Sequence, residues 1–293
     1  MRSHRIKKKG QPLGHRLLAK TDRVSKLGCM TAPLTNKAAG TPLVRLLLEA
    51  AMDLDRRMLL PSFSRTTFRQ RLRERPSGDG EPVVYFSGCF GNYCHPEGES
   101  IAALEVLERN GFRAVVPSTR CCGVARISSG AIDEAEEDAR HNVRLLQPLV
   151  RDGMPVLFSD PSCLFAVKMD YPKLLATEES REVANHCMDV MQFLAMLLRQ
   201  GKLNRSFGEL PMRVVYHNPC HTKAMGGGAE VKELLLLIPG IEWIEISDSC
   251  CGLAGTFGMK KVNFNLSATI GDPLFRAIRE VRPDRIITAC GAC

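Results

Sequence analysis

The sequence contains few aromatic residues and no long apolar run. Aromatic residues make up 6% of the 293 residues, and only one of them is a tryptophan. No apolar stretch approaches the ~20 residues that span a bilayer as a helix, so we expect no transmembrane segment. We also expect no signal peptide, because the basic start is not followed by an uninterrupted apolar stretch. The basic residues of this start are Arg2, Arg5, Lys7, Lys8 and Lys9.

Motifs that bind phosphate groups or flavin are also missing. The run Gly226-Gly227-Gly228 precedes an expected helix, but the Lys-Ser/Thr of a P-loop does not follow it. We interpret the run as a flexible turn. Without a flavin fingerprint or a phosphate-binding loop, the chain is not expected to bind a phosphorylated substrate itself.

Positive charge is concentrated in the N-terminal part of an otherwise ordinary globular composition. The net charge of the chain is +8. Residues 1–80 hold 18 Lys and Arg against 6 Asp and Glu, a net charge of +12, which leaves −4 for the rest. We name residues 1–80 the arm; it contains an amphipathic stretch at 43–54 and ends in a linker at 77–80. A basic arm attracts nucleic acid, anionic lipid or an acidic protein, and it can equally be a solvated linker.

Twelve cysteines are the most unusual feature of the composition. A disulfide framework is typical of short secreted chains, whereas this chain is long and shows no secretion signal. The thiols are therefore expected to bind metal or to take part in redox chemistry in a reducing compartment.

The cysteines lie in two copies of one unit. Each copy starts with an apolar run that ends in a cysteine, VVYFSGC at 83–89 and VVYHNPC at 214–220. A Cys-Cys-Gly follows about thirty residues later, and another apolar run then leads to Cys163 or Cys293. The second cysteine of the pair precedes this last cysteine by 41 residues in the first copy and by 42 in the second. We expect the arm at 1–80, a first cysteine-rich domain at 81–205 and a second at 206–293.

Short β-branched runs alternate with helical patterns in both copies, which predicts an α/β fold, preceded by a mainly helical arm. Ligands of such folds gather at the carboxyl ends of the strands, where the cysteines are expected to meet. The strands are expected at 83–87, 114–116, 156–159, 213–217, 243–246 and 285–288, and the helices at 100–110, 132–149, 229–238 and 272–282.

The second copy offers five thiols, one more than a tetrahedral zinc site or a cubane cluster commonly takes. An adjacent Cys-Cys pair suits a site with several irons, because neighbouring thiolates can reach different irons. Gly252 lacks a Cβ and is expected to let the backbone fold tightly against an inorganic core. Soft thiolates favour an iron–sulfur cluster or zinc over magnesium or calcium. The second cysteine set consists of Cys220, Cys250, Cys251, Cys290 and Cys293.

The first copy has four matching thiols, and Asp160 stands where the fifth would be. Four thiols can hold zinc or a smaller cluster. Asp160 is either a ligand or, in the interpretation we favour, the residue that shapes an Asp-Pro turn. Cys94 lies nearby and is either a substitute ligand or a buried spectator. The first cysteine set consists of Cys89, Cys121, Cys122 and Cys163.

Two histidines flank Cys220. His217 and His221 can each donate a hydrogen bond to a cluster sulfur and raise its reduction potential, or be structural. Cys29 and Cys187 match no motif and are expected to be structural.

The doubled pattern of Cys, Cys-Cys-Gly and Cys-x-x-Cys resembles the cysteine-rich CCG domain found in the B subunits of heterodisulfide reductases. This domain also occurs in iron–sulfur subunits of lactate and glycolate oxidation systems and in some succinate dehydrogenases. Within this family, the chain resembles above all the C subunits of anaerobic glycerol-3-phosphate dehydrogenases. The matching stretches are GCFGNYCHP (88–96), CCGVARISSG (121–130), PSCLFAVKMDYP (161–172), VVYHNPCH (214–221), SCCGLAGTFGMKK (249–261), GDPLFRAI (271–278) and, in the arm, KTDRVSKLGCMTAPLTNK (20–37) and LDRRMLLPSFSRTTFR (54–69).

The resemblance implies an iron–sulfur electron-transfer subunit that is not catalytic alone. Such a subunit passes electrons from a flavin-containing glycerol-3-phosphate dehydrogenase to membrane quinone. The resemblance also implies a noncubane 4Fe-4S cluster on the second cysteine set, with zinc or a second iron–sulfur centre on the first. We expect peripheral attachment to an anionic membrane surface, on the cytoplasmic face of the inner membrane, and no nucleic-acid partner.

Three departures from the family pattern are visible. No ferredoxin-like module precedes Cys89, and the chain stops at Cys293, so we expect the second domain to be truncated. Asp160 replaces a cysteine of heterodisulfide reductase. Other functions stay open: an iron–sulfur subunit like that of heterodisulfide reductase or of lactate and glycolate oxidation, or a zinc-stapled scaffold whose arm docks to a partner.

Overall fold

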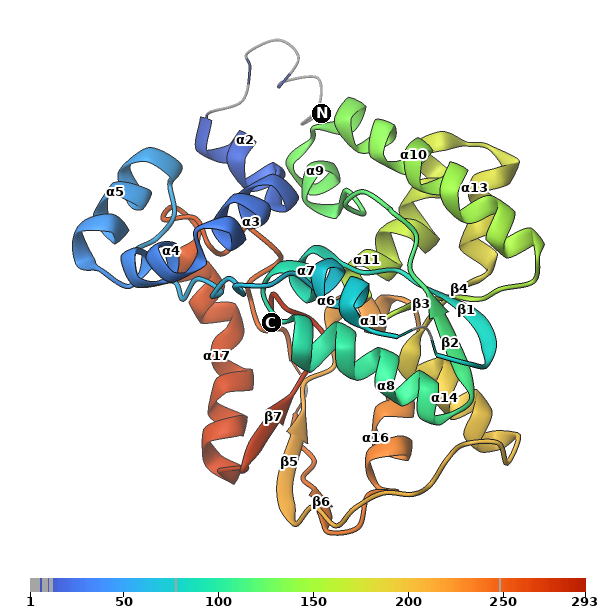
Figure 1. The fold of residues 1–293 in the computed structure, drawn as a ribbon. Coiled ribbons are helices and arrows are strands. Elements are labelled where there is room, and N and C mark those ends of the chain that lie inside the picture. Colours follow the sequence, from blue (N-terminus) through green and yellow to red (C-terminus); the bar gives the residue numbers. More distant parts are fainter. Residues whose placement is uncertain (1–5, 7–9, 11–12, 77, 248) are drawn as a thin grey trace.

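The structure is a computed structural model that describes residues 6, 10, 13–76, 78–247 and 249–293. Figure 1 shows the arm as a group of helices beside two sheets, each with its own helices. Ser77 of the expected linker lies outside the described residues. So does the basic start, Arg2, Arg5, Lys7, Lys8 and Lys9.

The first cysteine-rich unit is built on a four-stranded parallel sheet with the strand order β2-β1-β3-β4 (Figure 1). Val83, Val84 and Tyr85 of the inner strand β1 are all fully buried. A continuous apolar strand of this kind is typical of a parallel sheet that is covered on both faces. The strands are β1 (Glu81–Tyr85), β2 (Phe112–Val115), β3 (Val156–Phe158) and β4 (Cys187–Asp189).

Helices cover both faces of this sheet. α10, α12 and α13 pack on the face that carries Val84, while α8 and α14 pack on the face that carries Val83 and Tyr85. α10 turns Ala139, Val143 and the other members of one stripe into the core. The helices of this unit are α7 (Cys89–Tyr93), the π-helix η1 (Pro96–Ile101), α8 (Ala102–Arg109), α9 (Val124–Ser129), α10 (Ile132–Arg151), α11 (Pro161–Phe165), the π-helix η2 (Ala166–Asp170), α12 (Tyr171–Leu175), α13 (Glu178–Asn185) and α14 (Val190–Arg199).

The second unit repeats the topology of the first. Its parallel strands have the order β6-β5-β7, which corresponds to β2-β1-β3. Val214 and Val215 of β5 are fully buried, like their counterparts in β1. The predicted α/β fold with two cysteine-rich units is thus confirmed, while the domain boundaries at 80/81 and 205/206 stay predictions. The elements are β5 (Met212–Tyr216), α15 (Cys220–Ala224), α16 (Ala229–Leu235), β6 (Ile241–Trp243), α17 (Phe264–Val281) and β7 (Arg285–Ile287).

Some elements differ from the expected ones. The sequence does not predict β4, because Cys187-Met188-Asp189 lacks the β-branched residues that mark the other strands. The helix expected at 272–282 begins at Phe264, and Pro273 lies inside it. The strand expected at 243–246 lies earlier, at Ile241–Trp243. These differences leave the order of strands and helices unchanged.

The arm lies against both units and exposes apolar side chains. Its α3 packs on α7 and its α2 on α9. The backbone N–H of Asp55 donates to the carbonyl of Met259 at 2.9 Å, which ties the arm to the second unit. The helices are α2 (Leu13–Ala19), α3 (Thr21–Met30), α4 (Ala32–Ala39), α5 (Pro42–Met52) and α6 (Phe68–Glu74). Exposed apolar side chains on α3, α4 and α5 are Val24, Leu27, Met30, Leu34, Leu43, Leu46 and Leu47.

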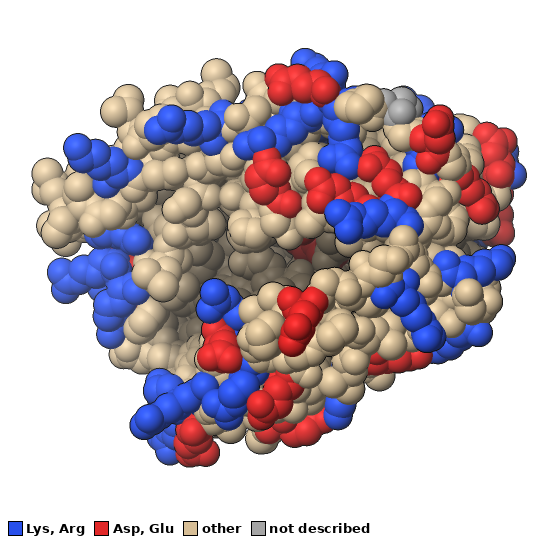
Figure 2. All heavy atoms as spheres, turned by 60° about the horizontal axis from the view of Figure 1, so that its bottom comes forward, with Lys and Arg blue, Asp and Glu red and all other residues tan. Residues whose placement is uncertain are grey.

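Charges of both signs are interspersed on the surface. Figure 2 shows Lys and Arg beside Asp and Glu around a hollow that is lined mainly by uncharged residues. Within the described ranges, no helix combines the length and the apolar character needed to cross a membrane.

Candidate metal centres

Every cysteine of the two sets follows the carboxyl end of a strand. Cys89 begins α7 after β1, and Cys220 begins α15 after β5. The Cys-Cys pairs follow β2 and β6, and Cys163 and Cys290 follow β3 and β7. Because parallel strands of one sheet end at the same edge, thiols that are far apart in the sequence meet there. All twelve cysteines are described, and none forms a disulfide.

The first cysteine set forms a chain of thiol hydrogen bonds. Cys89 is bonded to Cys121, Cys121 to Cys122, and Cys122 to Cys163. The bonds from Cys122 and Cys89 lower the pKa of Cys121 well below that of an ordinary thiol. The same bonds, together with burial, raise the pKa of Cys89 and of Cys122. The set therefore favours one thiolate that its neighbouring thiols stabilise.

The second cysteine set converges in the same way but is more exposed. The Sγ atoms of Cys251 and Cys293 are 3.3 Å apart. A ring nitrogen of His217 and these two Sγ atoms all lie within 4.8 Å of one another. A hydrogen bond joins Cys293 to Cys290, and Cys220 is close enough for the charges of the other thiols to raise its pKa, after burial. Three of the five thiols are exposed, whereas none of the first set is.

In the second cysteine set, the surroundings of Cys251 strongly favour its ionised form, the thiolate. Hydrogen bonds from Cys293 and His217 lower the pKa of Cys251 to about 4. The bond to Cys293 also lowers the pKa of Cys290 to about 7. Cys293 has its pKa raised, because it donates to Cys251 and Cys290. Thiolates are the form in which cysteine binds metal, so the set is prepared for a cation.

The donors of both sets fit an iron–sulfur cluster or zinc. They are soft sulfur ligands, and among the described residues the group that converges around Cys251 contains one histidine and no carboxylate. Hard cations such as magnesium and calcium need oxygen ligands and are not served by this arrangement. The count of five thiols in the second set exceeds what one tetrahedral zinc ion takes.

The structure shows a packing reason for glycine at position 252. A Cβ at this position would lie 2.1 Å from the carbonyl oxygen of Ser267 in α17. The Ser267 hydroxyl donates to the Gly252 carbonyl at 2.9 Å, and Gly252 has a φ of 82°. The missing side chain therefore allows α17 to approach the Cys-Cys loop, while the expected close approach of this loop to an inorganic core stays a prediction.

Asp160 caps a helix, as the favoured interpretation predicts. Its Oδ1 accepts a hydrogen bond from the backbone N–H of Ser162 at 2.7 Å, at the start of α11. The carboxyl group also borders the first cysteine set. A Cβ on Gly88 would lie 3.1 Å from the Sγ of Cys163 and 3.8 Å from Oδ2 of Asp160. Burial raises the pKa of Asp160 above that of an ordinary aspartate.

Three further cysteines have other surroundings. The pKa of Cys94 is raised to about 12 by burial, by Cys29 and by Glu99, and none of these belongs to the first cysteine set. The thiol of Cys29 donates to the carbonyl of Ser64 at 2.7 Å. Cys187 is fully buried and donates to the carbonyl of Val183 at 3.1 Å. Such contacts are typical of structural cysteines.

The two histidines beside Cys220 differ in their contacts. His217 is buried and faces Cys251 and Cys293, whereas His221 stacks on Phe165 with ring centroids 4.8 Å apart. Burial lowers the pKa of His221. The sequence does not predict which of the two histidines faces the second cysteine set, because both lie one to three residues from the same cysteine.

The two cysteine sets flank one interface between the units. Phe165 of the first unit packs on His221 of the second, and α11 packs on α15. The hydroxyl of Ser162 lies 3.8 Å from the Sγ of Cys290. Sequence spacing does not reveal these pairs, since Ser162 and Cys290 are separated by 128 positions.

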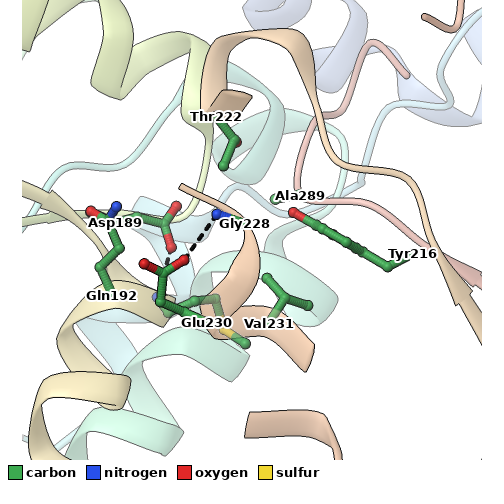
Figure 3. A pocket seen from close by; sticks show the side chains of 9 residues that line it. Asp189, Gln192, Tyr216, Thr222, Gly228, Glu230, Val231 and Ala289 are labelled. Carbon is green, nitrogen blue, oxygen red and sulfur yellow. Dashed lines mark hydrogen bonds between the residues drawn. The ribbon is translucent and has the colours of Figure 1, made fainter. Parts of the chain in front are cut away.

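A small pocket lies next to Cys290 but contains no cysteine among its described lining residues (Figure 3). The carboxyl groups of Asp189 and Glu230 lie close together in it. Asp189 caps α14 by accepting from the backbone N–H of Met191 at 2.7 Å. Burial, with a smaller effect of Glu230, raises the pKa of Asp189 to about 7. The pocket is therefore an acidic feature beside the thiols rather than a part of their site.

Arg126 is a residue near the first cysteine set that the sequence analysis does not single out. Its side chain is 3% exposed and carries three ion pairs. A comparison of the two copies could have drawn attention to this arginine, because CCGVAR in the first copy corresponds to CCGLAG in the second.

The comparisons with known proteins agree with this arrangement. The family described as a cysteine-rich domain, CCG, matches residues 83–168 and 214–293. The chain is 36% identical over 283 residues to the C subunit of the anaerobic glycerol-3-phosphate dehydrogenase of Escherichia coli (strain K12), with 94% of this chain and 70% of that one aligned.

Two further relatives act in other systems. The D subunit of the dihydromethanophenazine:CoB–CoM heterodisulfide reductase of Methanosarcina barkeri is 32% identical over 228 residues, covering 73% of this chain and 53% of its own. Lactate utilization protein A of Geobacillus thermodenitrificans is 32% identical over 200 residues, covering 65% of this chain and 80% of its own. These relatives support an iron–sulfur cluster, electron transfer and association with dehydrogenase or reductase subunits. The chain belongs to the cysteine-rich CCG-domain family, with one copy of the domain in each of its two units.

Proposed function

We propose that the chain is an iron–sulfur subunit that passes electrons from a flavin-dependent glycerol-3-phosphate dehydrogenase to membrane quinone. The convergence of the second cysteine set is the observation that carries this proposal, with Cys251 and Cys293 at 3.3 Å and three thiols open to solvent. The similarity to a glycerol-3-phosphate dehydrogenase subunit over 94% of the chain supports the choice of the electron donor.

The second cysteine set would hold a noncubane 4Fe-4S cluster. When bound, such a cluster accepts and donates single electrons. The chain itself would supply the thiolates and their surroundings. His217, which is bonded to Cys251, would draw charge from a ligand sulfur, and such a bond raises a reduction potential. The five ligands would be Cys220, Cys250, Cys251, Cys290 and Cys293.

The first cysteine set would hold zinc or a second iron–sulfur centre. The four thiols are linked by hydrogen bonds, and Cys122 and Cys163 are buried. Asp160, which caps α11, takes the place of a fifth thiol. A closed set of four is typical of a structural or less reactive centre. The ligands would be Cys89, Cys121, Cys122 and Cys163.

The partners would be flavin-containing dehydrogenase subunits and an anionic membrane surface that carries the quinone. The arm has a net charge of +12 and exposes apolar side chains on α3, α4 and α5. This combination suits peripheral attachment, which we propose for the cytoplasmic face of the inner membrane. We propose no nucleic-acid partner.

Anaerobic purification followed by counts of iron, acid-labile sulfide and zinc tests the cofactor. Iron with sulfide is expected, and zinc alone would identify a zinc-stapled scaffold. Adding purified flavin-containing dehydrogenase subunits, glycerol 3-phosphate and a quinone analogue tests the function. Quinone reduction that depends on this chain is expected, and its absence from a cluster-loaded complex would contradict the proposal.

Disulfide reduction at the second cysteine set is a second function that one observation favours. Cys220, Cys250 and Cys293 are exposed, so a disulfide substrate could approach the set. The 32% identity to a heterodisulfide reductase subunit fits the same chemistry. Disulfide reductase activity of the cluster-loaded chain, with no quinone reduction, would favour this function over the first.

A further inference from the structure

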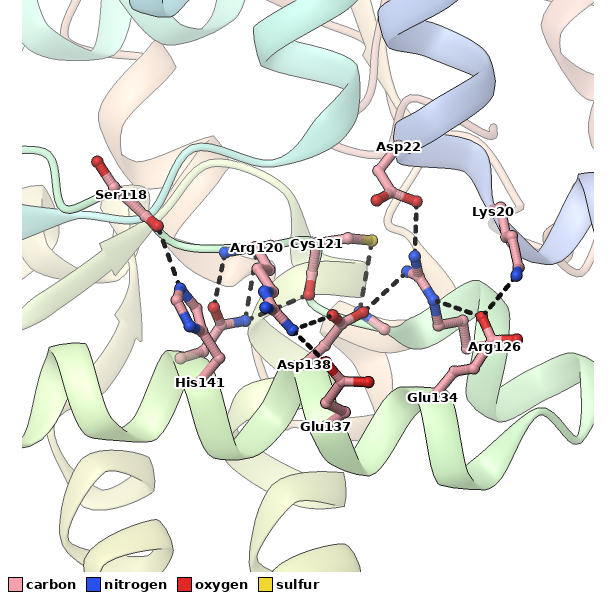
Figure 4. A network of polar contacts seen from close by, with 12 residues as sticks. Lys20, Asp22, Ser118, Arg120, Cys121, Arg126, Glu134, Glu137, Asp138 and His141 are labelled. Carbon is pink, nitrogen blue, oxygen red and sulfur yellow. Dashed lines mark hydrogen bonds and ion pairs between the residues drawn. The ribbon is translucent and has the colours of Figure 1, made fainter.

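Arg126 is a buried arginine surrounded by carboxylates from two parts of the chain. Its guanidinium lies 2.8 Å from Oδ1 of Asp22, 3.1 Å from Oδ2 of Asp138 and 3.8 Å from Oε2 of Glu134. Asp22 belongs to α3 of the arm, while Asp138 and Glu134 belong to α10 (Figure 4). A buried guanidinium is costly unless it is paired in this way, so its position is strictly held.

The same guanidinium is connected to the Cys-Cys loop of the first cysteine set through Asp138 and Arg120. Arg126 follows Cys122 by four residues, and Figure 4 shows it in one network with Cys121. The loop between them is tight, because the backbone N–H of Gly123 donates to the Sγ of Cys121 at 3.4 Å.

The second unit has no counterpart of this arginine. When the two Cys-Cys-Gly motifs are aligned, Arg126 corresponds to Gly255. Alignment of VVYF with VVYH places Phe86 at the position of His217, the basic side chain that is bonded to Cys251. Each unit thus sets a basic side chain beside its Cys-Cys pair, but from a different position.

We propose that Arg126 supplies the fixed positive charge that compensates the thiolates of the first cysteine set, and that Asp22 of the arm is the residue that positions it. This inference rests on the proposed function, in which the first set binds a metal centre. Four thiolates bring more negative charge than one divalent cation neutralises, and a guanidinium keeps its charge at every pH of interest. The arm is then part of the support of the centre and not only a docking segment.

The test measures the zinc affinity of the first set in the full chain, by anaerobic competition with a chelator of known affinity. All five cysteines of the second cysteine set are replaced by serine throughout, so that the zinc bound reports on the first set. Arg126→Gln is expected to lower the affinity by about 10- to 100-fold, as the loss of other outer partners of metal ligands does. Arg126→Lys keeps the charge and is expected to restore most of the affinity, which a purely structural role of the guanidinium fork would not predict.

Asp22→Asn separates positioning from a direct charge effect. If Asp22 acted only through its own negative charge, its removal would favour the thiolates and raise the zinc affinity. As the positioning residue of Arg126 it should lower the affinity instead. A rise would overturn the part that the proposal assigns to Asp22.

Two controls keep the test decisive. Arg126→Gln leaves carboxylates unpaired, so Arg126→Gln/Asp138→Asn is compared with Asp138→Asn alone, and the double variant should bind zinc more weakly. Arg120→Gln removes a half-exposed arginine from the same network and should have little effect. Unchanged affinity in both Arg126→Gln variants would overturn the proposal. Cys121→Ser then separates two explanations of such a result. If it also leaves zinc binding unchanged, the proposed ligands of the first set are wrong as well. If it abolishes zinc binding, the ligands stand and only the role of Arg126 is wrong.

Discussion

At the scale of single residues, Cys251 combines more favourable features than any other thiol we describe. It follows β6, its Sγ lies 3.3 Å from that of Cys293, and a ring nitrogen of His217 lies within 4.8 Å of both sulfur atoms. A serine at this position would replace the thiolate by a harder and far more basic oxygen, which binds iron poorly. The adjacent Cys250 has the same chemistry but is exposed.

We predict that Cys250→Ser and Cys251→Ser each lose the iron and sulfide of the second cysteine set. The matched control is Cys187→Ser, since Cys187 is a buried cysteine that belongs to neither set. It should keep its iron at a cost of about 1–3 kcal/mol in the free energy of unfolding, because a more polar hydroxyl replaces a fully buried thiol. Iron analysis and absorption spectra check this. Full iron content and an unchanged spectrum in both Cys-Cys variants would show the ligand assignment to be wrong.

At the scale of elements, a single buried carboxyl group caps the start of α14. Asp189 caps this helix, and burial raises its pKa to about 7. Between the unfolded pKa of ~3.9 and this value, the folded chain holds a proton that the unfolded chain has lost. The free energy of unfolding therefore falls as the pH rises through this window. The stabilisation by the protonated Asp189 is largest at the low-pH end.

We predict that Asp189→Asn removes this pH dependence. Asparagine still accepts a hydrogen bond as an N-cap residue, but it does not ionise. The difference in unfolding free energy between the variant and the parent should change in favour of the variant by roughly 2–4 kcal/mol as the pH is raised from ~4 to ~7.5. Denaturant unfolding at several pH values checks this. A constant difference across the window would mean that Asp189 does not titrate there.

The arm helices offer a second element-scale prediction. α5 has no buried residue, and apolar side chains of α3 and α4 such as Leu27 and Leu34 also face solvent, beside an excess of basic residues. Each Lys or Arg near an anionic surface contributes on the order of 1 kcal/mol, and salt weakens that attraction. The full chain should bind vesicles with anionic lipid, bind neutral vesicles weakly, and be released by high salt. Cosedimentation checks this, and binding that is indifferent to salt would indicate apolar docking.

At the scale of the whole molecule, the two units share a topology but differ in the exposure and the residue types of their cysteine sets. The order β2-β1-β3 is repeated as β6-β5-β7, yet the first set is the less exposed one and has Asp160 in place of a thiol. A carboxylate is a harder ligand than a thiolate and suits zinc better than a cluster of low potential. We therefore expect a redox cluster in the second unit and a different centre in the first.

We predict that Asp160→Cys makes the first unit more like the second, with extra iron bound and a second set of cluster signals. Loss of the cap of α11 should cost about 1 kcal/mol in the free energy of unfolding. Asp160→Asn keeps the cap and is the control, with no gain of iron. Electron paramagnetic resonance and iron counts check this. Two equivalent clusters in the unaltered protein would contradict the asymmetry.

Much of the fold follows from local patterns in the sequence. Apolar runs such as VVYFSGC place a buried strand directly before a cysteine, and the stripe of 132–149 predicts α10. Strand β4 is not predicted because Cys187-Met188-Asp189 contains no β-branched residue, and the contact of Gly252 with Ser267 is not predicted because the two residues belong to different elements. A local pattern carries no information on contacts between distant elements.

The sequence by itself determined the two copies, the α/β class and the grouping of nine cysteines into two sets, because periodicity and spacing are properties of neighbouring residues. Only the tertiary structure decided which histidine meets Cys251, and that Asp22 of the arm holds Arg126 across 104 positions. Both are results of packing between elements distant in the chain. Sequence spacing predicts that a cysteine lies at the end of a strand. Which charged side chains surround that cysteine depends on how the helices pack around the end of the strand.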